Sequence, residues 1–425
     1  MRILYSLVLY LCAPLALCYL LLRGTKNRAY LERIPERFGY IREPGSAQPV
    51  IWVHAVSVGE VQASVTLVKR LLGAYPECRV LLTTVTPTGA ARVRSLFAGA
   101  VEHRYLPYDL PHAVRLFLRR INPRLLVILE TEIWPNLLYY CKRRGVPAIL
   151  VNARLSDASY RGYLRLRRFS SPAVRQLSHI AAQSAADAER FLALGADPAG
   201  VSVTGNLKFD IEAPQDLAGQ AQSLRRSLAA ERPVWIAAST HEGEEIMVLD
   251  AFLHVREAVT GCLLIIAPRH PERFDKVYDL CRRRGLDVAR HSGAAGVTPR
   301  NPDVYLLDTL GDLPLFYACC DAAFVGGSLV PAGGHNMLEA AKLAVPLISG
   351  RHTANFSEII GFFKAADAIM IVADAAELAA AVTRLLQDDE LRRTRGERGQ
   401  QVTQLNQGAV DSVMALLDGY LVLDY

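Results

Sequence analysis

Charged side chains directly follow several apolar runs in this sequence. Glu60 stands behind a glycine in VHAVSVGEVQAS (53–64), and Glu130 and Glu132 come at the end of the run LLVILE (125–130). Lys208 follows VSVTGN (201–206) in the same way. In a parallel α/β sheet, ligands bind beyond the carboxyl ends of the strands, so chemistry is expected at these positions. A carboxylate there can accept a proton, and an ammonium group can bind an anion.

Each of these residues also has a simpler explanation. Glu60 can be an acid in the first turn of a helix that only complements the helix dipole. Glu130 and Glu132 can be solvated loop acids. Taken singly, the residues leave these alternatives open, but their joint placement at strand ends favours a functional role.

The second half of the chain repeats this arrangement. Its strand ends carry STHEGEE (239–245), APRHPERF (267–274), DTLGD (308–312) and GGSLVPAGGHNMLEA (326–340). A proline-stiffened turn or a glycine turn before an ordinary helix would explain the second and the last of these. No GxGxxG or P-loop motif follows a strand, which disfavours dinucleotide and P-loop ATP chemistry. The eight cysteines form no CxxC pair, so we expect reduced core thiols and no metal site.

Short apolar runs alternate with amphipathic stretches, which predicts strands buried between helices. Continuously apolar strands are typical of mostly parallel sheets, so the fold class is α/β. The expected strands are 49–55, 79–85, 124–130, 147–153, 179–184, 201–205, 233–240, 262–270, 303–309, 321–327 and 345–350. We expect two Rossmann-like domains facing each other across a cleft, at 23–212 and 232–425, joined by a polar linker at 213–231 that carries Pro214.

The first residues predict a membrane anchor at 1–22. Residues 3–22 are free of charge and long enough to span a bilayer as a helix, with Arg2 before them and Arg23 and Lys26 after them. A cleaved signal peptide would need small residues before its scission site, which Leu20 to Leu22 do not supply. The positive-inside rule places the rest of the chain in the cytoplasm. Pro14 leaves open whether the anchor spans the membrane or lies in one leaflet.

Several motifs together carry a resemblance to a known family. In chain order they are WVHAVSVGEVQA, ETEIWPNLL, NARLSD, TGNLKFD, STHEGEE, APRHPERF and GGHNMLEAA. This ordered set, over nearly the whole chain, resembles the 3-deoxy-D-manno-octulosonic acid (Kdo) transferases of glycosyltransferase family 30. The resemblance implies a GT-B fold, CMP-Kdo as donor, lipid IVA as acceptor, and a place at the cytoplasmic face of the bacterial inner membrane.

The resemblance also implies roles for individual residues. Glu60 matches the family's proton acceptor, while Glu130 and Lys208 match residues credited with stabilising the transition state; Glu130 could equally orient Lys208 through a salt bridge. The residues that match the CMP-Kdo site are Pro268, Arg269, Leu310, Gly311, Asp312, Asn336, Met337, Leu338 and Glu339. Met337 departs from the small residue expected there, so its contact with the nucleotide should be through its backbone. Inverting transfer without metal or cofactor is expected.

The basic stretch YRGYLRLRRF (160–169) has two interpretations. Arg161, Arg165 and Arg168 can form an ordinary solvated face, or they can hold the anionic acceptor at the bilayer surface. A net charge of +6 fits an anionic partner, but the apolar anchor argues against nucleic acid. Two rival functions remain: a sugar-nucleotide epimerase, which shares the two-domain fold, and a non-enzymatic membrane scaffold. The number of Kdo units added and the oligomeric state are not predicted.

Overall fold

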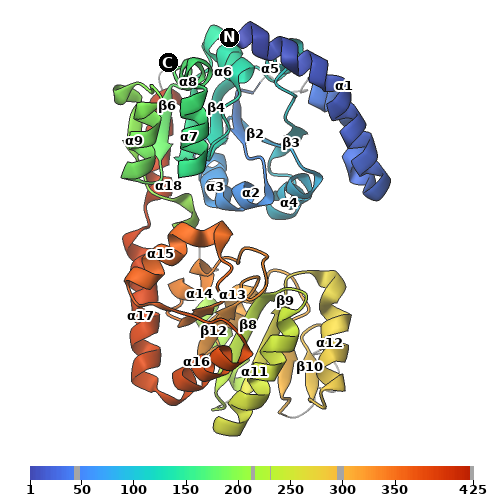
Figure 1. The fold of residues 1–425 in the computed structure, drawn as a ribbon, viewed down its shortest axis with the longest axis vertical. Helices are drawn as coiled ribbons and strands as arrows, with labels where there is room; N and C mark the ends of the chain where they lie inside the picture. The colour runs from blue at the N-terminus through green and yellow to red at the C-terminus, as the bar shows by residue number, and fades with distance from the viewer. Residues whose placement is uncertain (43–47, 212–215, 230, 294–300, 422–425) are drawn as a thin grey trace. The chain divides into compact units, whose positions relative to one another are not determined.

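The chain folds into two compact α/β units. The computed structural model describes residues 1–42, 48–211, 216–229, 231–293 and 301–421. Unit 1 comprises Met1–Asp210 and Gln407–Tyr425, and unit 2 comprises Ile211–Asn406 (Figure 1). Each unit contains one seven-stranded sheet in which every strand pair is parallel. The predicted pair of Rossmann-like domains is confirmed.

The sheet of unit 1 has the order β3-β2-β1-β4-β5-β6-β7. Its strands are β1 (Val50–His54), β2 (Arg79–Thr84), β3 (Glu102–Tyr105), β4 (Pro123–Leu129), β5 (Ala148–Ala153), β6 (His179–Ala182) and β7 (Val201–Val203). Val53 of β1 lies opposite Leu82 on one side and Val127 on the other. Strands are added in one direction up to β3 and in the other from β4, so the order reverses between β1 and β4. Ligands bind beyond the carboxyl ends of strands at such a reversal.

Helices cover both faces of this sheet because its strands are apolar on both faces. All five residues of β1 are buried, and two separate apolar clusters contain Val53 and Trp52 respectively. The helices of unit 1 are α1 (Arg2–Lys26), α2 (Val58–Ala63), α3 (Val65–Ala74), α4 (Pro87–Phe97), α5 (Pro111–Ile121), α6 (Pro135–Arg143), α7 (Asp157–Arg165), α8 (Arg167–Val174), α9 (Ala185–Ala193) and α18 (Ala409–Leu421), with 3-10 turns η1 (Arg28–Leu31), η2 (Ile34–Phe38), η3 (Pro198–Gly200) and η4 (Leu207–Phe209). Side chains of Ser57, Thr86, Ser156 and Ser184 cap α2, α4, α7 and α9.

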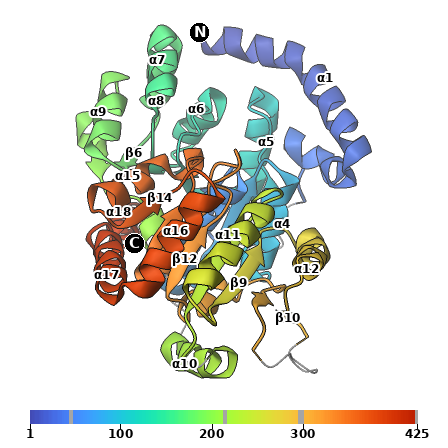
Figure 2. The same ribbon diagram turned by 60° about the horizontal axis from the view of Figure 1, so that its bottom comes forward.

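The sheet of unit 2 has the order β10-β11-β9-β8-β12-β13-β14 and reverses between β8 and β12. Its strands are β8 (Val234–Thr240), β9 (Leu263–Pro268), β10 (Val288–Arg290), β11 (Val304–Leu306), β12 (Ala322–Val325), β13 (Leu347–Ser349) and β14 (Ile369–Ile371). Its helices are α10 (Leu217–Leu228), α11 (Glu244–Ala258), α12 (Phe274–Arg283), α13 (Leu313–Tyr317), α14 (Leu338–Lys342), α15 (Ser357–Ala365), α16 (Ala375–Gln387) and α17 (Asp389–Leu405), with 3-10 turns η5 (Pro271–Arg273) and η6 (Ala354–Phe356). Helices α11 and α16 lie side by side on one face of the sheet (Figure 2).

The domain limits differ from the prediction in two places. Much of the predicted linker 213–231 is helix α10, while residues 213–215 and 230 lie outside the described part. The assignment of the last residues to the second domain is wrong, because α18 belongs to unit 1. Val410, Val413 and Leu417 join the apolar cluster beneath the first sheet. An amphipathic helix can cover either sheet, and its own pattern does not specify which one.

Helix α1 is long and apolar enough to serve as the predicted membrane anchor. Within the part of the chain that the structure describes, it is the one helix that meets this test of length and composition. It contains Pro14 and extends four residues beyond the predicted anchor limit at 22, to Lys26.

Asp210 joins the two chain segments of unit 1. Its carboxylate accepts hydrogen bonds from the backbone N–H groups of Gly408, at 2.8 Å, and Val410, at 2.6 Å, at the start of α18. We expect Asp210→Ala to lower the stability of α18 by about 1–2 kcal/mol, as loss of a helix-capping acceptor does. Hydrogen–deuterium exchange of residues 409–421 would measure it.

The matched control is Asp411→Ala, which removes an exposed carboxylate in the first turn of α18 that pairs with Arg70 of α3. An exposed ion pair and a first-turn acid each contribute less than about 1 kcal/mol, so exchange of α18 should change less than in Asp210→Ala. Equal exchange in both variants would contradict the role given to Asp210.

Candidate functional site

Glu60 lies where β1 passes into α2, beside the strand reversal of unit 1. Its Oε2 accepts a hydrogen bond from Val56 N–H at 2.8 Å, and its Oε1 accepts one from Ser57 Oγ at 3.0 Å. Ser57 Oγ in turn accepts the N–H of Glu60 at 3.3 Å. This reciprocal pattern is a variant of the capping box, with the N–H of Val56 and the hydroxyl of Ser57 in place of the N–H of Ser57, so Glu60 does help to start its helix. A carboxylate has about four acceptor sites, so two hydrogen bonds leave room for a further proton.

Glu60 is more deeply buried than a carboxylate that only complements a helix dipole needs to be. The residue is only 9% exposed, and burial, opposed by its hydrogen bond from Val56 and assisted by the nearby carboxylates of Glu130 and Glu132, raises its pKa to about 7. A Cβ added at Gly59 would meet nothing closer than Ser57 Oγ, at 3.7 Å. The packing of the chain itself therefore does not require glycine at 59, and the space beside Glu60 is open to a ligand.

Glu130 follows β4, the strand next to β1, and forms an ion pair with Lys208. Lys208 Nζ lies 3.2 Å from Glu130 Oε1, and both side chains are about three-quarters buried, with 22% and 26% exposed. Glu130 has φ +59°, a left-handed conformation that is strained for a residue other than glycine. The structure thus brings Glu60, Glu130 and Lys208 together at one sheet edge, and it contains the salt bridge that the sequence left as one interpretation of Glu130.

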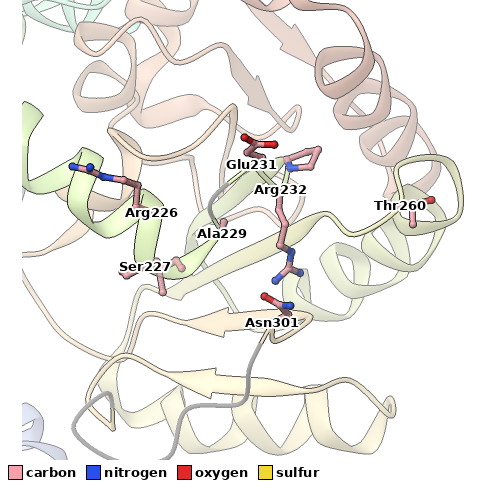
Figure 3. A pocket seen from close by; sticks show the side chains of 9 residues that line it. Arg226, Ser227, Ala229, Glu231, Arg232, Thr260 and Asn301 are labelled. Atoms are coloured by element: carbon pink, nitrogen blue, oxygen red, sulfur yellow. The ribbon is translucent and has the colours of Figure 1, made fainter.

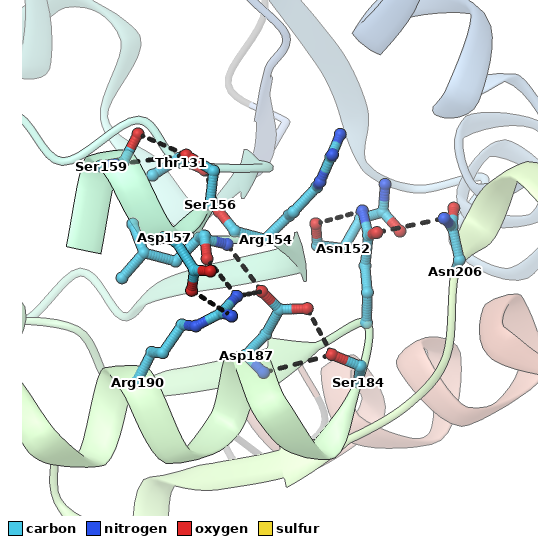
Figure 4. Close-up of polar contacts among 12 residues, drawn as sticks. Thr131, Asn152, Arg154, Ser156, Asp157, Ser159, Ser184, Asp187, Arg190 and Asn206 are labelled. Carbon is cyan, nitrogen blue, oxygen red and sulfur yellow. Dashed lines mark hydrogen bonds and ion pairs between the residues drawn. The ribbon is translucent and has the colours of Figure 1, made fainter. Parts of the chain in front are cut away.

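A network of amides that the sequence analysis missed holds Lys208. Asn152 Oδ1 accepts the N–H of Leu207 at 3.0 Å, and Gln183 bridges Asn152 to Asn206. Asn206 Oδ1 then accepts the N–H of Lys208 at 3.0 Å. Figure 4 shows Asn152 and Asn206 of this network. The network fixes the η4 turn on the ends of β5 and β6. The motifs NARLSD and TGNLKFD contain two of these residues, but spacing alone could not show that the motifs touch.

Glu132 lies close to the basic stretch of α7 and α8. Trp134 Nε1 donates to Glu132 Oε2 at 2.8 Å, and burial raises the pKa of this carboxyl. Glu132 in turn adds to the burial that raises the pKa of Tyr163, a residue of α7. The arginines of the stretch, Arg161, Arg165, Arg167 and Arg168, are exposed, and no ion pair involves them among the described residues. Their charges therefore face solvent.

In unit 2, Arg269 follows β9 and lies close to a pair of histidines. Nε2 of His241 and Nε2 of His335 are 2.7 Å apart, so one ring donates to the other and the two share one proton. Burial lowers the pKa of both rings, that of His335 to about 4, and the positive charge of Arg269 adds to both shifts. Arg269 itself is exposed, with its N–H bonded to Thr240 O at 3.0 Å. An exposed guanidinium beside neutral rings is free to pair with an anion.

The other predicted donor residues follow β11 or begin α14. Leu310 is 69% exposed, Gly311 has φ +104°, and Asp312 accepts a hydrogen bond from Thr309. Met337 and Leu338 are each 1% exposed, so their side chains pack in the core and only their backbones can meet a ligand.

Two backbone N–H groups at or just before the start of α14 already have acceptors within the chain. Asn336 Oδ1 accepts the N–H of Leu338 at 3.1 Å, and the N–H of Gly334 donates to Gly327 O at 2.7 Å. Glu339, in the first turn of α14, is partly exposed. The side chain of Asn336 therefore accepts a backbone N–H of its own loop, two residues further along the chain.

Glu244 holds the glycine loop that follows β12, a role that the sequence analysis missed. It is fully buried, and its carboxylate accepts four backbone N–H groups. They belong to His241 at 2.9 Å, Gly327 at 2.6 Å, Ser328 at 2.8 Å and Leu329 at 2.8 Å. An internal carboxylate therefore fills a position that would otherwise attract an anion.

A hollow near the end of α10 lies away from these residues. Ala229, Glu231 and Arg232 line it together with Asn301 (Figure 3). Arg232 and Glu231 precede β8, so the hollow is at the amino end of that strand. Because ligands in doubly wound sheets bind at the carboxyl ends, we do not assign it to the site. Among the described residues, no group of three or more His, Cys, Asp or Glu side chains is placed to hold a metal ion.

The fold and the placement of charged residues define the class of protein. Two doubly wound units are the GT-B architecture of glycosyltransferases. In fold, the chain is similar to UDP-GlcNAc 2-epimerase from Neisseria meningitidis, with a TM-score of 0.55 over 87% of this chain and 99% of the other, but at 14% identity. At that identity the likeness shows the fold alone.

The sequence comparisons give the family. The family model for 3-deoxy-D-manno-octulosonic-acid transferase (kdotransferase) matches residues 32–211. The chain is 38% identical, over 99% of both chains, to 3-deoxy-D-manno-octulosonic acid transferase from Haemophilus influenzae. It is 36% identical to that from Bordetella pertussis, over 98% of this chain and 99% of the other. The chain belongs to the Kdo transferase family, and the predicted family, fold and enzyme class are confirmed.

The raised pKa of Glu60 predicts a pH dependence of stability. Between pH 4.5, its usual pKa, and about 7, the folded protein retains a proton that the unfolded chain has lost. The free energy of unfolding should therefore fall as pH rises through this window. Glu60→Gln should remove that part of the slope, which melting temperatures of both proteins from pH 4 to 8 would measure.

Asp109 has a similarly raised pKa, to about 7, and is intact in both proteins, so the difference isolates Glu60. Parallel pH curves for wild type and variant would show that Glu60 ionises as an ordinary exposed acid.

Glu244→Gln should loosen the glycine loop. An amide NH₂ would face backbone N–H groups that now have an acceptor, and an unsatisfied buried donor costs about 1–3 kcal/mol. We expect a lower melting temperature and faster hydrogen exchange at residues 326–329. Glu242→Gln is the control, since this carboxylate is 83% exposed and pairs only with Arg273 among the ion pairs of the described residues. Matching exchange in the two variants would argue against the clamp.

Proposed function

We propose that this Kdo transferase moves Kdo from CMP-Kdo to lipid IVA with inversion, without metal or cofactor, and with Glu60 as the base. The observation that carries the proposal is Glu60 itself. It is a buried carboxylate with a raised pKa, at the strand reversal of unit 1, beside the Glu130–Lys208 pair. Membership of the family supports the nature of the transferred sugar.

The transfer reaction requires a general base, and a raised pKa makes a carboxylate a stronger one. A sugar hydroxyl is a poor nucleophile, so its proton must leave as its oxygen attacks the anomeric carbon of Kdo. The bond from that carbon to the phosphate oxygen breaks, its electron pair leaves with CMP, and the hydroxyl proton passes to Glu60. A carboxylate with a pKa of about 7 is substantially deprotonated at neutral pH and more basic than an ordinary glutamate. The hydrogen bonds from Val56 and Ser57 keep it in one orientation.

Lys208 is suited to the negative charges of the reaction. Both the Kdo carboxylate and the departing phosphate are anionic, and an ammonium group held in place stabilises charge without reorganisation. Glu130 is the residue that positions Lys208, through their 3.2 Å ion pair. We therefore assign Glu130 an indirect role and Lys208 a direct one.

The donor nucleotide is assigned to unit 2. Arg269 is exposed beside the strand ends and can pair with a phosphate through two parallel hydrogen bonds. The backbones around Leu310, Met337 and Leu338 and the carboxylate of Glu339 are the expected partners of the ribose and base. These contacts would bind CMP with an arginine in place of a metal ion.

The acceptor and the membrane are assigned to unit 1. Arg161, Arg165 and Arg168 are exposed and form no ion pair among the described residues, and their segment includes Tyr163, which lies near Glu132. They suit the phosphates of a bisphosphorylated glycolipid. With α1 in the inner membrane, the enzyme would work from the cytoplasmic side.

The epimerase alternative has only the shared fold in its favour, and fold does not decide function. The sequence relatives at high coverage are Kdo transferases. An epimerase of a soluble sugar nucleotide also has no use for α1.

The direct test is a transfer assay. The purified full-length protein would be incubated with lipid IVA and with CMP-Kdo generated in situ, and the lipid weighed by mass spectrometry. A mass increase of one or more Kdo units supports the proposal and also counts the units. An unchanged lipid, with intact CMP binding, would refute the assignment of the acceptor.

Glu60→Gln should stop the chemical step without disturbing the fold. Glutamine is an accepted residue at this position of a capping box, so the start of α2 should survive. Loss of a general base costs on the order of 10² to 10⁴ in rate. Single-turnover transfer would measure the loss, with CMP and lipid binding near wild type as the control. Near-normal transfer would leave Glu60 with only its helix-capping role.

Arg269→Ala should weaken CMP binding. A charge-assisted hydrogen bond contributes about 1.5–3 kcal/mol, which is roughly tenfold or more in affinity. Calorimetry with CMP would measure it. Arg273→Ala is a poor control because Arg273 pairs with the buried Glu245, so the exposed neighbour His270 is the matched site. His270→Ala should bind CMP more tightly than Arg269→Ala, and the reverse order would move the phosphate away from Arg269.

A further inference from the structure

The amino-terminal end of α1 is fixed to unit 1 by polar contacts. Arg2 Nη1 donates to Asn136 Oδ1 at 3.0 Å, and Ser6 Oγ lies 3.2 Å from the same oxygen. Tyr5 bonds the carboxylate of Asp109, which also accepts the backbone N–H of Asn136. Asn136 is fully buried and Asp109 is 4% exposed. A buried polar group without a hydrogen-bond partner is destabilising, so the polar side chains of α1 and their buried partners favour one specific position of the helix on unit 1.

Aromatic contacts extend this attachment along the first half of the helix. The rings of Tyr5 and Phe169 of α8 are 5.1 Å apart. Tyr10 Oη lies 2.8 Å from Nδ1 of His112, a residue of α5, and the two rings stack at 5.5 Å. The helix therefore touches α5, α6 and α8 through its first ten residues.

The carboxyl-terminal end of α1 packs on the turn that follows it, and the next turn contacts the sheet of unit 1. Leu20 is 4% exposed, and Gly24 packs so tightly that a Cβ there would lie 2.3 Å from the side chain of Leu31 in η1. The chain then enters η2, where Arg33 donates to His103 O at 3.1 Å and Glu36 accepts the N–H of Tyr105 at 2.9 Å. Both of these partners belong to β3.

The amino-terminal end of the helix thus contacts the α/β body of unit 1 directly, and its carboxyl-terminal end is joined to the same unit through η1 and η2. A helix of 25 residues is about 37 Å long, more than the roughly 30 Å of hydrocarbon in a bilayer. If α1 crossed the membrane, its two ends would lie on opposite sides. Unit 1 could then keep its contacts with one end only, because a water-soluble α/β unit cannot enter the hydrocarbon.

The opposite face of α1 remains uncovered and apolar. Leu4, Leu7, Leu11, Leu15 and Leu22 are between 56% and 78% exposed. A continuous apolar surface of this length marks a membrane or protein contact. Basic residues stand at both ends, Arg2 at one and Arg23 and Lys26 at the other, which suits anionic headgroups on one side of a bilayer. Pro14 removes a backbone hydrogen bond, which allows the bend in α1 that Figure 1 shows along the side of unit 1.

We infer that α1 lies lengthwise in a single leaflet, with its amino terminus on the same side of the membrane as unit 1 and its leucine face in the acyl chains. Glu60, Glu130 and Lys208 would then be held at a fixed height above the membrane, because unit 1 is attached to α1 by the contacts at its amino-terminal end as well as by the chain that follows its carboxyl-terminal end. The inference refines the proposed location of the enzyme. Its test measures only the side of the membrane on which each end of the chain lies, so the result does not depend on whether the enzyme transfers Kdo to lipid IVA.

The test uses the full-length protein with a short uncharged epitope tag before Met1 and a second tag after Tyr425. Protease is added to spheroplasts, which expose the periplasmic side, and to inverted inner-membrane vesicles, which expose the cytoplasmic side. We expect both tags to survive in spheroplasts and both to be lost in inverted vesicles. Loss of the first tag from spheroplasts, with the second intact, would show a spanning helix and overturn the inference.

A second measurement uses two exposed leucines of α1, Leu4 and Leu15, which share one face because eleven residues make about three turns. With Cys12 and Cys18 changed to serine and one of these leucines changed to cysteine, a spin label on the new cysteine would report its depth in vesicles of anionic phospholipid. In a helix that lies in one leaflet, the two depths should be similar; in a spanning helix they would differ by about 16 Å, from a rise of 1.5 Å per residue. Labels shielded from lipid-soluble quenchers would instead show that a second copy of the chain covers the leucine face, which also overturns the inference.

Discussion

A parallel sheet covered by helices on both faces leaves only its ends for polar chemistry. The strands of this protein are buried almost throughout, so functional side chains have to project from the loops at the carboxyl edge. The reversal of strand order, between β1 and β4 in unit 1 and between β8 and β12 in unit 2, separates neighbouring loops there. Glu60 and Glu130 follow the two strands of the first reversal, and His241 and the glycine loop follow those of the second.

Buried or half-buried carboxylates organise these loops by accepting backbone N–H groups. Glu244 takes four of them, Asp210 joins α18 to the end of the first segment, and Asp109 holds the start of α6. Each carboxylate is stable in the interior because the donors replace water. Only one backbone N–H and one hydroxyl reach the oxygens of Glu60, so burial prevails and its pKa rises to about 7, as that of Asp109 also does. The same local structure that starts a helix therefore also leaves a basic group for the reaction.

The attachment of α1 follows the same principle at the membrane. A helix that is apolar on nearly all sides would be expected to leave the globular unit for the bilayer. Arg2, Tyr5 and Ser6 lie on one face of its first two turns and meet the buried Asn136 and Asp109. These polar contacts give the helix a defined position on unit 1, and the position determines which leucines can face lipid.

The sequence by itself determined the class of the fold, the family and the positions of the charged residues. Apolar runs of strand length force a parallel sheet, and chemistry in such a sheet is confined to one edge, so Glu60, Glu130, Lys208 and Arg269 could be selected from their places after those runs. Tertiary structure decided which of these residues meet. The Glu130–Lys208 ion pair joins positions 78 residues apart. The amide network beneath Lys208 joins the carboxyl ends of β5, β6 and β7. It also decided that α18 covers the first sheet and that Glu244 fills the glycine loop, because an amphipathic pattern or a single acid does not specify its partner. Likewise, the charge-free run predicted an anchor, but only the contacts at both of its ends indicate how it meets the membrane.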